Sequence, residues 1–525
     1  MDDLGLSLAI MLTLLGVVAT VMTMYRKYRL RHYSIPVRDP TKGHRFIMVD
    51  MFTSTTYCNV EETRLIHGAQ CDTCGICVDD SKMKEANKRI PCKAVASKDT
   101  NMKHHWVRGN LPNYSECMIC GEDCGVEFSL SDLHCAWCKN TVHDSCAAKT
   151  DVCDLGKYQQ FIVPPTCLEV KWVGVKGTRQ RHLIIKNVRH LKVGLWTPLI
   201  VIANRKSGSN DGELLLRNFR GYLNPAQVMD IQDISPENAL EWCNLLPDVT
   251  FQLLVCGGDG TIGWVLTAIE RLRLQNRPHV CILPLGTGND LSRVLGWGEG
   301  YTGDVEVEKI LNNIKKAKPV KLDRWSVEIK HEKHFGLARP SKTYIMNNYL
   351  SVGVDALVTL NFHRQRESWP SLFAHRLINK ICYLTYGTKD VLERECKHLH
   401  KKIKVILDGK EIILPEIEGV VVLNIASWGG GCQPWGSGIS EEGYADPRYD
   451  DGVLEVMGLF SSFHIAQLQV GLASPLRLGQ GKEVTIILHG GNAPIQVDGE
   501  PWEQHPAYIS ITHKGQAAMM ALKDS

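Results

Sequence analysis

The histidines and cysteines between His104 and Cys153 constrain the fold of this 525-residue chain more than any other feature. Two CxxC pairs stand in regular spacing with further histidine and cysteine donors, and each zinc ion needs four such ligands. We therefore expect a small domain with two zinc sites, whose folding depends largely on metal binding. Histidines among the cysteines also favour a reducing compartment over a disulfide framework. The expected ligands are His104, Cys117, Cys120, Cys135, Cys138, His143, Cys146 and Cys153, with His105 as an alternative to His104.

This spacing resembles that of the cysteine-rich diacylglycerol/phorbol-ester domain, in which two interleaved ligand sets bind two zinc ions. The same pattern can be placed upstream, and there the resemblance implies one zinc site made of His44, Cys71, Cys74 and Cys92. The other site would consist of Cys58, Glu61, Asp79 and Lys82, a set that cannot hold zinc, although Cys77 could replace a missing thiolate. We therefore expect a degenerate zinc domain over residues 44–92 and an intact one over 104–153. Such domains can bind lipid, bind a protein or brace a neighbour, and the sequence leaves these alternatives open.

An uncharged run at residues 4–24 is long enough to cross a membrane, because as a helix it would span about 31 Å against a hydrocarbon core of ~30 Å. We expect residues 1–31 to form a membrane anchor helix with a basic flank, which places the later domains on the cytoplasmic side. The endoplasmic reticulum and the plasma membrane are both compatible with this anchor. A cleaved signal peptide and a re-entrant helix are the alternatives. The net charge of +3 gives no reason to expect a nucleic-acid partner.

Three apolar strands, at residues 199–203, 251–256 and 280–284, each run into a turn rich in glycine or asparagine and then into a helix. This repeat predicts a doubly wound α/β lobe that binds a nucleotide at the carboxyl ends of its strands. Neither a Walker motif nor the protein-kinase motifs are present, so backbone and metal must hold the phosphates. Asp259 can face them if Mg²⁺ lies between. The candidate nucleotide-binding residues are Asn204, Ser207, Gly208, Gly257, Gly258, Gly260, Thr261, Gly286, Thr287, Gly288 and Asn289.

The stretches ANRKSGSNDG, VCGGDGT, LPLGTGNDLSR and QVDGEPW resemble, in this order, the eukaryotic diacylglycerol kinases, over about residues 197–502. An amino-terminal anchor before two cysteine-rich domains is most similar to the epsilon type, which prefers arachidonoyl diacylglycerol. The resemblance implies an enzyme that uses ATP and Mg²⁺ to phosphorylate the free hydroxyl of 1,2-diacylglycerol, giving phosphatidic acid at a membrane. It also implies a catalytic set of Asp259, Asp290, Asp498 and Glu500, in which Asp498 is the general base and Glu500 assists with metal or nucleotide. A hairpin Asp-Gly turn without chemistry is the alternative for Asp498.

The expected architecture is therefore multidomain, with an amino-terminal hydrophobic helix, two small zinc-bound domains and a two-lobed lipid-kinase unit. A basic linker is expected over residues 154–196, the nucleotide-binding catalytic lobe over 197–325 and a β-rich accessory lobe over 326–525. In that second lobe, residues 450–452 are either a metal site or a hairpin turn, and residues 362–392 either contact acyl chains or form a core helix. Two other functions stay open, a sphingosine- or ceramide-type kinase and an anchored zinc scaffold with an inactive kinase lobe.

Overall fold

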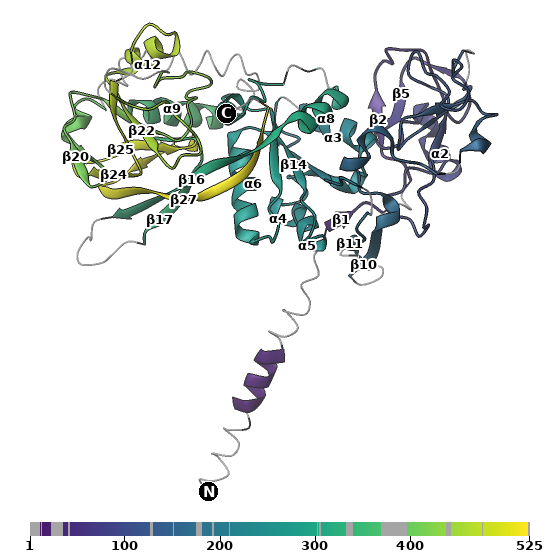
Figure 1. Cartoon of the computed structure of the whole chain (residues 1–525), viewed down its shortest axis with the longest axis horizontal. Coiled ribbons are helices and arrows are strands. Elements are labelled where there is room, and N and C mark those ends of the chain that lie inside the picture. The colour runs from purple at the N-terminus through teal and green to yellow at the C-terminus, as the bar shows by residue number, and fades with distance from the viewer. Residues whose placement is uncertain are drawn as a thin grey trace.

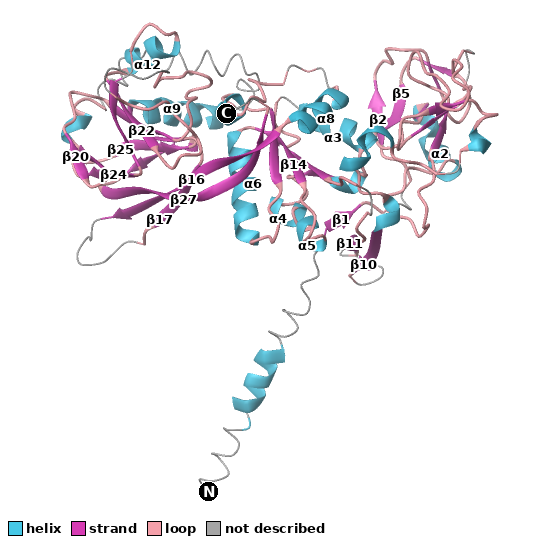
Figure 2. Cartoon of the chain, in the orientation of Figure 1, coloured by secondary structure: helices cyan, strands magenta, loops and turns pink. Residues whose placement is uncertain are grey.

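The computed structural model describes residues 11, 13–22, 35–39, 43–126, 130–150, 152–174, 181–191, 194–208, 211–301, 303, 306–331, 340–368, 396–436, 443–474 and 476–522. The cysteine-rich domains lie at one end of the molecule, the parallel-strand lobe in the middle and the β-rich lobe at the other end (Figure 1). Helices surround the central strands, whereas the outer lobe consists mostly of strands (Figure 2).

Most of the expected anchor, residues 4–24, lies outside the described residues, which in this stretch are 11 and 13–22. Residues 13–22 are helical. Within the part of the chain that the structure describes, no helix combines the length and the apolar character that a membrane span needs. The prediction of a transmembrane helix is thus not supported.

Both cysteine-rich domains are built from short strands. The first contains β2 (Phe46–Val49), β3 (Thr56–Tyr57), β4 (Arg64–Leu65), β5 (Gly68–Cys71), β6 (Cys77–Val78), the 3-10 turn η2 (Asp80–Lys82) and α2 (Met83–Arg89). The second contains β7 (Trp106–Arg108), β8 (Leu133–Cys135), β9 (Thr141–Val142) and η3 (Ala147–Lys149). Strands of two to four residues enclose little apolar core, so these domains fit a fold that relies on metal binding.

The segment expected to be a basic linker, residues 154–196, is folded in its described part, so that interpretation was wrong. It contains η4 (Gly156–Phe161), η5 (Pro165–Cys167), β10 (Leu168–Val173) and β11 (His182–Val188). β11 pairs with β10 and also with β1 (Ile35–Val37), which precedes the first zinc domain. Phe161, Ile162 and Val163 are buried, because this segment packs against the neighbouring lobe. The lysines and arginines that suggested a linker stand among apolar residues that are buried, such as Leu183, Ile184 and Ile185.

The parallel-strand lobe has the doubly wound arrangement that the repeat predicted. Its strands lie in the order β13 (Val228–Asp230), β12 (Leu199–Ala203), β14 (Gln252–Gly257) and β15 (His279–Pro284). Alternate side chains of β12 enter two different cores, with α6 (Asp259–Leu272) packed on one face of the sheet and α3 (Asp211–Tyr222) on the other. The other described helices of this lobe are α4 (Pro236–Ala239), α5 (Trp242–Leu245), α7 (Asp290–Val294) and α8 (Val307–Lys316), with the 3-10 turn η6 (Pro225–Gln227).

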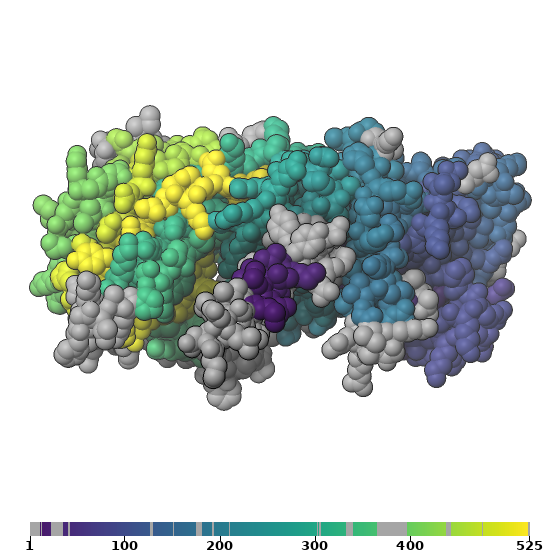
Figure 3. Space-filling model, turned by 90° about the horizontal axis from the view of Figure 1, so that it is seen from below, coloured from purple at the N-terminus to yellow at the C-terminus, as the bar shows by residue number. Residues whose placement is uncertain are grey.

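Two long strands join the lobes, β16 (Lys318–His331) and β27 (Ala507–Ala521). They pair along their whole length, and β27 also lies parallel to β15, so one ten-stranded sheet passes through both lobes. The view from below shows the carboxyl-terminal segment reaching from the β-rich lobe toward the middle of the molecule (Figure 3). The expected boundary at residue 325 therefore falls inside a strand that both lobes share.

The same ten-stranded sheet includes β17 (Lys342–Met346), β19 (Ile403–Leu407), β20 (Lys410–Ile412) and β24 (Glu483–Leu488). A second sheet of six strands contains β18 (Tyr349–Gly353), β21 (Gly419–Leu423), β22 (Leu454–Leu459), β23 (Leu476–Gly481), β25 (Ala493–Val497) and β26 (Glu500–Gln504). The helical elements of this lobe include α9 (Val354–Ser368), α12 (Ser462–Gln469) and the 3-10 turn η8 (Leu399–Lys401). Most of the segment 362–392, for which acyl-chain contact was one interpretation, lies outside the described residues.

Candidate active site and zinc centres

The second cysteine-rich domain brings its eight predicted ligands together in two groups of four. One group is Cys117, Cys120, His143 and Cys146, and the other is His104, Cys135, Cys138 and Cys153, with all donor atoms of a group within 4.8 Å of one another. His104 Nδ1 lies 3.6 Å from Cys138 Sγ, which favours His104 over His105 as the ligand. The sulfur atoms of Cys135 and Cys153 are 4.0 Å apart. A tetrahedral zinc site with Zn–S bonds of about 2.3 Å places its sulfurs roughly 3.8 Å apart, so the donors fit zinc.

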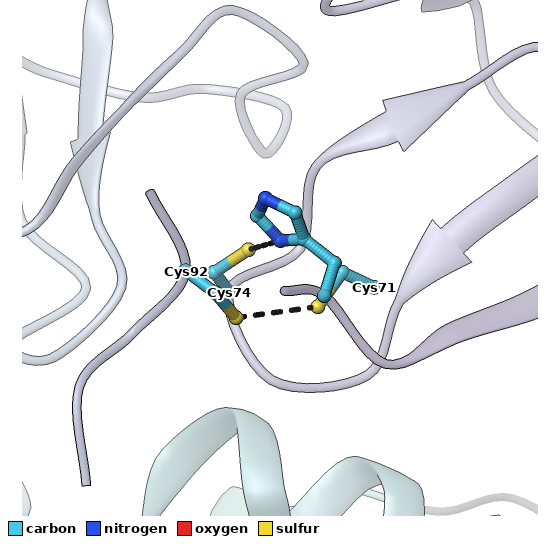
Figure 4. Close-up of side chains that lie close together, drawn as sticks. Cys71, Cys74 and Cys92 are labelled. Atoms are coloured by element: carbon cyan, nitrogen blue, oxygen red, sulfur yellow. Dashed lines mark hydrogen bonds between the residues drawn. The ribbon is translucent and has the colours of Figure 1, made fainter. Parts of the chain in front are cut away.

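The first domain brings together the donor set that the resemblance implied. Cys71 Sγ lies 3.8 Å from Cys92 Sγ, and Cys74 Sγ lies 3.2 Å from His44 Nδ1. Figure 4 shows the three sulfur atoms turned toward one another beside an imidazole ring. Hydrogen bonds from Cys74 and Cys92 lower the pKa of Cys71 far below that of a free thiol, which favours the thiolate that a zinc site requires.

An ion pair lies where the first domain would need its second zinc site. Lys82 Nζ is 2.6 Å from Glu61 Oε1, and Asp79 accepts hydrogen bonds from Ser81 as the cap of η2. Cys77 does not substitute for the missing thiolate, because in the described part of the chain no group of metal-binding side chains includes Cys58 or Cys77. Burial raises the pKa of the Cys77 thiol to about 12, which also disfavours a thiolate there.

In the catalytic lobe, the two glycine turns after β14 and β15 press against each other. A Cβ on Gly286 would lie 2.7 Å from Gly258 Cα, and Leu285 N donates to Gly257 O at 2.9 Å. Only glycine permits this approach, which leaves the backbone N–H groups of both turns at one edge of the sheet. Asn289 fixes the second turn, because its side-chain amide donates to Gly286 O and Glu299 O. The candidate residues Gly260, Thr261, Thr287 and Gly288 lie in these same two turns and the start of α6.

The third predicted turn follows the neighbouring strand β12. Asn204 Oδ1 accepts the N–H of Lys206, and Asn204 O accepts the N–H of Ser207. Gly208 has a φ of +65°, in the left-handed region that suits glycine. Because β12, β14 and β15 are parallel neighbours, all three turns leave the sheet at its carboxyl edge, where nucleotides bind in folds of this kind.

Asp259 is the first residue of α6, and among the described residues only one of its two carboxylate oxygens has a hydrogen-bond partner. Its Oδ2 accepts the Asp290 N–H at 3.0 Å, whereas its buried Oδ1 has no hydrogen-bond partner among the described residues. Burial, and then the charges of Asp290 and Asp498, raise the pKa of Asp259 to about 7. Asp259 therefore lies within reach of the negative charges of both other carboxylates. An unpaired carboxylate oxygen in such a group fits a divalent cation, because oxygen ligands and surplus negative charge are what Mg²⁺ requires.

Asp290 is held from the opposite lobe, by the loop that follows β21. Its carboxylate accepts hydrogen bonds from Ser427 Oγ at 2.5 Å, from Gly430 N at 3.1 Å and from Gly431 N at 3.0 Å. Burial nevertheless raises the pKa of Asp290. These partners were not predicted, although the unusual Gly429-Gly430-Gly431 run was visible in the sequence. These hydrogen bonds connect Asp290 of the catalytic lobe to a loop of the β-rich lobe.

Asp498 lies in a two-residue hairpin turn between β25 and β26, with a φ of +49°. Its Oδ1 accepts the N–H groups of Asn348 and Tyr349, and its Oδ2 accepts both the backbone and side-chain N–H of Asn347. A carboxylate has about four acceptor positions, so the chain itself uses all of them. Glu500, by contrast, is exposed on β26, and no hydrogen bond among the described residues links it to the three aspartates.

Arg324 on β16 connects this turn to α6. Its guanidinium donates to Asn347 Oδ1 at 3.0 Å, to Leu266 O at 3.2 Å and to Glu270 Oε2 at 2.8 Å. Because the Asn347 oxygen faces Arg324, its amide N–H₂ must face Asp498. The network ties the helix that carries Asp259 to the turn that carries Asp498, and the sequence offered no local pattern for it.

Sequence profiles of known domains match three segments of the chain. The diacylglycerol kinase catalytic domain matches residues 198–323, and the diacylglycerol kinase accessory domain matches residues 345–501. The chain belongs to the diacylglycerol kinase family. The third profile, the phorbol esters/diacylglycerol binding (C1) domain, matches residues 104–155, which is the intact cysteine-rich domain.

Relatives with known names support the same family. The probable diacylglycerol kinase 3 of Caenorhabditis elegans is 34% identical over 509 residues, which are 89% of this chain and 63% of that protein. Diacylglycerol kinase iota of mouse is 34% identical over 88% of this chain and 48% of its own length, and the human iota protein is 33% identical over the same shares. This chain therefore spans less than two thirds of the relatives it matches. The predicted epsilon type is not supported by these relatives.

Proposed function

We propose that this diacylglycerol kinase family member transfers the γ-phosphoryl group of ATP to the free hydroxyl of 1,2-diacylglycerol, giving phosphatidic acid at a membrane. The observation that carries the proposal is the contact of Asp290 both with Asp259 and with the loop of the other lobe, beside two glycine turns that press together. Asp498 of the β-rich lobe lies near enough for its charge to act on Asp259. Such an edge suits the phosphates of a nucleotide, and the catalytic and accessory domain matches supply the substrate class.

The glycine turns would bind the phosphates through backbone N–H groups, and Asp259 would hold Mg²⁺ through its unpaired oxygen. The chemistry that a bound Mg²⁺ supplies in phosphoryl transfer is neutralisation of the charge that develops on the phosphate. Asp290, braced by three donors from the other lobe, would keep the two lobes in one arrangement around the reacting groups. Positioning of this kind supplies most of the catalysis in phosphoryl transfer.

We retain Asp498 as the proposed base, with a condition that its hydrogen bonds impose. Asp498 can take the proton of the acceptor hydroxyl only after it releases one of its four N–H donors. An Asp498→Asn variant should lower turnover by roughly 10²–10⁴. Because the new amide N–H₂ would face N–H donors, its melting temperature must be measured beside its turnover. Near-normal turnover would exclude Asp498 as the base.

The function is tested by offering three acceptors side by side. Purified full-length protein is given labelled ATP, Mg²⁺ and vesicles that contain diacylglycerol, ceramide or sphingosine. We expect label in phosphatidic acid alone. Label in ceramide phosphate or sphingosine phosphate would reassign the enzyme to the sphingosine- or ceramide-type kinases, and no label with any acceptor would favour a zinc scaffold with an inactive kinase lobe.

Location and acyl preference extend this proposal. We propose that the chain is held at the cytoplasmic side of a membrane by residues 1–31 and, from the resemblance to the epsilon type, that it favours arachidonoyl species. Deletion of residues 1–31 should release the protein from membranes while phosphorylation of detergent-solubilised diacylglycerol continues, because the predicted catalytic residues all follow Thr197. Unchanged membrane retention would contradict the anchor, and equal rates with arachidonoyl and dioleoyl acceptors would contradict the preference.

A further inference from the structure

Large apolar side chains are exposed at both ends of the short helix α12 in the β-rich lobe. Phe463 is 63% exposed and Phe460, just before the helix, 46%, while Val470 and Leu472 after it are 65% and 78% exposed. We call these four residues the α12 patch. Apolar side chains that gather at the surface of a soluble domain indicate a binding surface. α12 lies against α9 and β22 at the outer edge of its lobe (Figure 1).

The segment around the α12 patch carries no charged side chain between Glu455 and Arg477. Of the two flanking charges, Glu455 is fully buried, and Arg477 is half-buried and donates to Trp435 O at 2.7 Å. The histidine within the segment, His464, is also buried, where its ring nitrogens meet Phe460 N and Ser474 O. A segment of this kind can enter an apolar environment without burying a charge of its own.

The helix that carries the α12 patch contacts the loop that holds a catalytic carboxylate. Cys432 Sγ donates to Leu468 O at 3.3 Å, and a Cβ on Gly429 would lie 3.2 Å from Gln469 Nε2. The next two residues of that loop, Gly430 and Gly431, donate to Asp290. α12 therefore packs on the back of the loop whose front forms the proposed active site.

We propose that the α12 patch docks on the bilayer leaflet that contains the acceptor lipid, an inference that rests on the proposed function. A diacylglycerol stays in the membrane, so its hydroxyl reaches the three aspartates only if a neighbouring surface of the kinase contacts that membrane. The contact between α12 and the Asp290 loop puts the patch on the same lobe face as that loop, and the lack of charge in its segment fits the acyl and headgroup boundary. The polar side chains of this segment, such as Gln467 and Gln469, are uncharged, so they can lie at the headgroup boundary without burying a charge.

The test compares a membrane acceptor with a soluble one. The full-length variant Phe463→Ser/Leu472→Ser is assayed with dioleoylglycerol in phosphatidylcholine vesicles and with dihexanoylglycerol below its aggregation concentration. Ile413→Ser is the matched control, because Ile413 is 95% exposed next to β20 and outside the uncharged segment. All three changes replace exposed side chains, so folding should be preserved.

We expect the α12 variant to lose about tenfold in kcat/KM on vesicles while its rate on the soluble acceptor stays within about twofold of the wild type. The control should match the wild type on both acceptors. Equal vesicle rates for the α12 variant and the control would overturn the proposal, and so would an equal loss on both acceptors. A wild type that phosphorylates neither acceptor would instead refute the proposed function.

Discussion

The two cysteine-rich domains share one donor set and differ in the other. In both, a histidine near the start and a cysteine near the end join a CxxC pair, as His44 and Cys92 do in the first domain. The second domain adds a complete set of Cys117, Cys120, His143 and Cys146, whereas the first has the Lys82–Glu61 ion pair in the corresponding place. The shared set joins residues from the beginning and the end of each domain. We therefore infer that this donor set is the one that a domain of this type needs in order to fold.

The domains also differ in how they contact the catalytic lobe. Asp72 lies between two ligands of the first domain, and its carboxylate is 3.0 Å from Arg220 of α3. Lys93, directly after the ligand Cys92, donates to the carbonyls of Arg220, Gly221 and Leu223 at the end of that helix. The second domain contacts the lobe through apolar packing, since Trp137 and Cys138 share a buried cluster with Phe219 of α3. Its ion pair Arg108–Asp144 lies within the domain and is exposed to solvent. Both domains thus contact the kinase lobe, and the first domain adds a buried ion pair to that contact.

The largest effect on folding should follow from substituting a cysteine of the shared donor set. We expect Cys74→Ser and Cys138→Ser each to abolish the fold of their domain, because a structural zinc site contributes on the order of 10–16 kcal/mol. Metal analysis of the wild type should give about three zinc ions per chain, one for each complete set of four donors. Four ions would contradict the loss in the first domain, and two would mean that its remaining set does not bind zinc.

The next effect separates the buried ion pair from the exposed one. Burial raises the pKa of Asp72, while Arg220 and Arg45 oppose that rise. Asp72→Asn leaves Arg220 buried without a counter-charge and should reduce the free energy of unfolding by about 3–5 kcal/mol. The matched change Asp144→Asn should cost about 0–1 kcal/mol. Similar losses in urea unfolding would show that the first domain does not dock as described.

A smaller loss is expected for Lys93→Met. Its ammonium group is buried, so the substitution removes three hydrogen bonds at the end of α3 but also the cost of burying a charge. We expect a decrease of about 1–3 kcal/mol in the free energy of unfolding. Lys103→Met, at an exposed pair with Asp99, is the control and should leave stability unchanged. An unchanged free energy of unfolding in Lys93→Met would show that Lys93 does not stabilise the end of α3.

The smallest effect should come from the ion pair that stands in place of zinc. Lys82 and Glu61 are both partly exposed, so Lys82→Ala should leave the melting temperature and the zinc content almost unchanged. A clear loss of zinc in this variant would mean that this half of the first domain still supports metal binding.

Much of this organisation was predictable because it depends on local spacing. CxxC pairs and strand–glycine–helix units are set by residues close together in sequence, so the zinc donors and the three turns follow from local pattern. The grouping of the donors into sets came from the resemblance to the cysteine-rich domain family. Contacts between distant segments were not predictable. Ser427 reaches Asp290 across 137 positions, and β1 pairs with β11 on the far side of both zinc domains. No local pattern marks such partners.

The same reason explains the wrong boundaries. The strand β16 was predicted to contain a lobe boundary, but its pairing with β27 makes it part of both lobes. The segment 154–196 was predicted to be a basic linker, but its strands β10 and β11 pair with each other. The role of Asp498 was inferred from family position, whereas its four N–H donors come from a turn about 150 residues earlier.

The central claim is that carboxylates from two lobes form one lipid-kinase site, and phosphoryl transfer by the Asp259→Asn variant tests it most directly. Wild-type and variant proteins are given labelled ATP, diacylglycerol vesicles and a series of Mg²⁺ concentrations. We predict phosphatidic acid from the wild type, a loss of roughly 10²–10⁴ in turnover for the variant and a weaker dependence on Mg²⁺. Equal turnover and equal Mg²⁺ dependence in the two proteins would contradict the account.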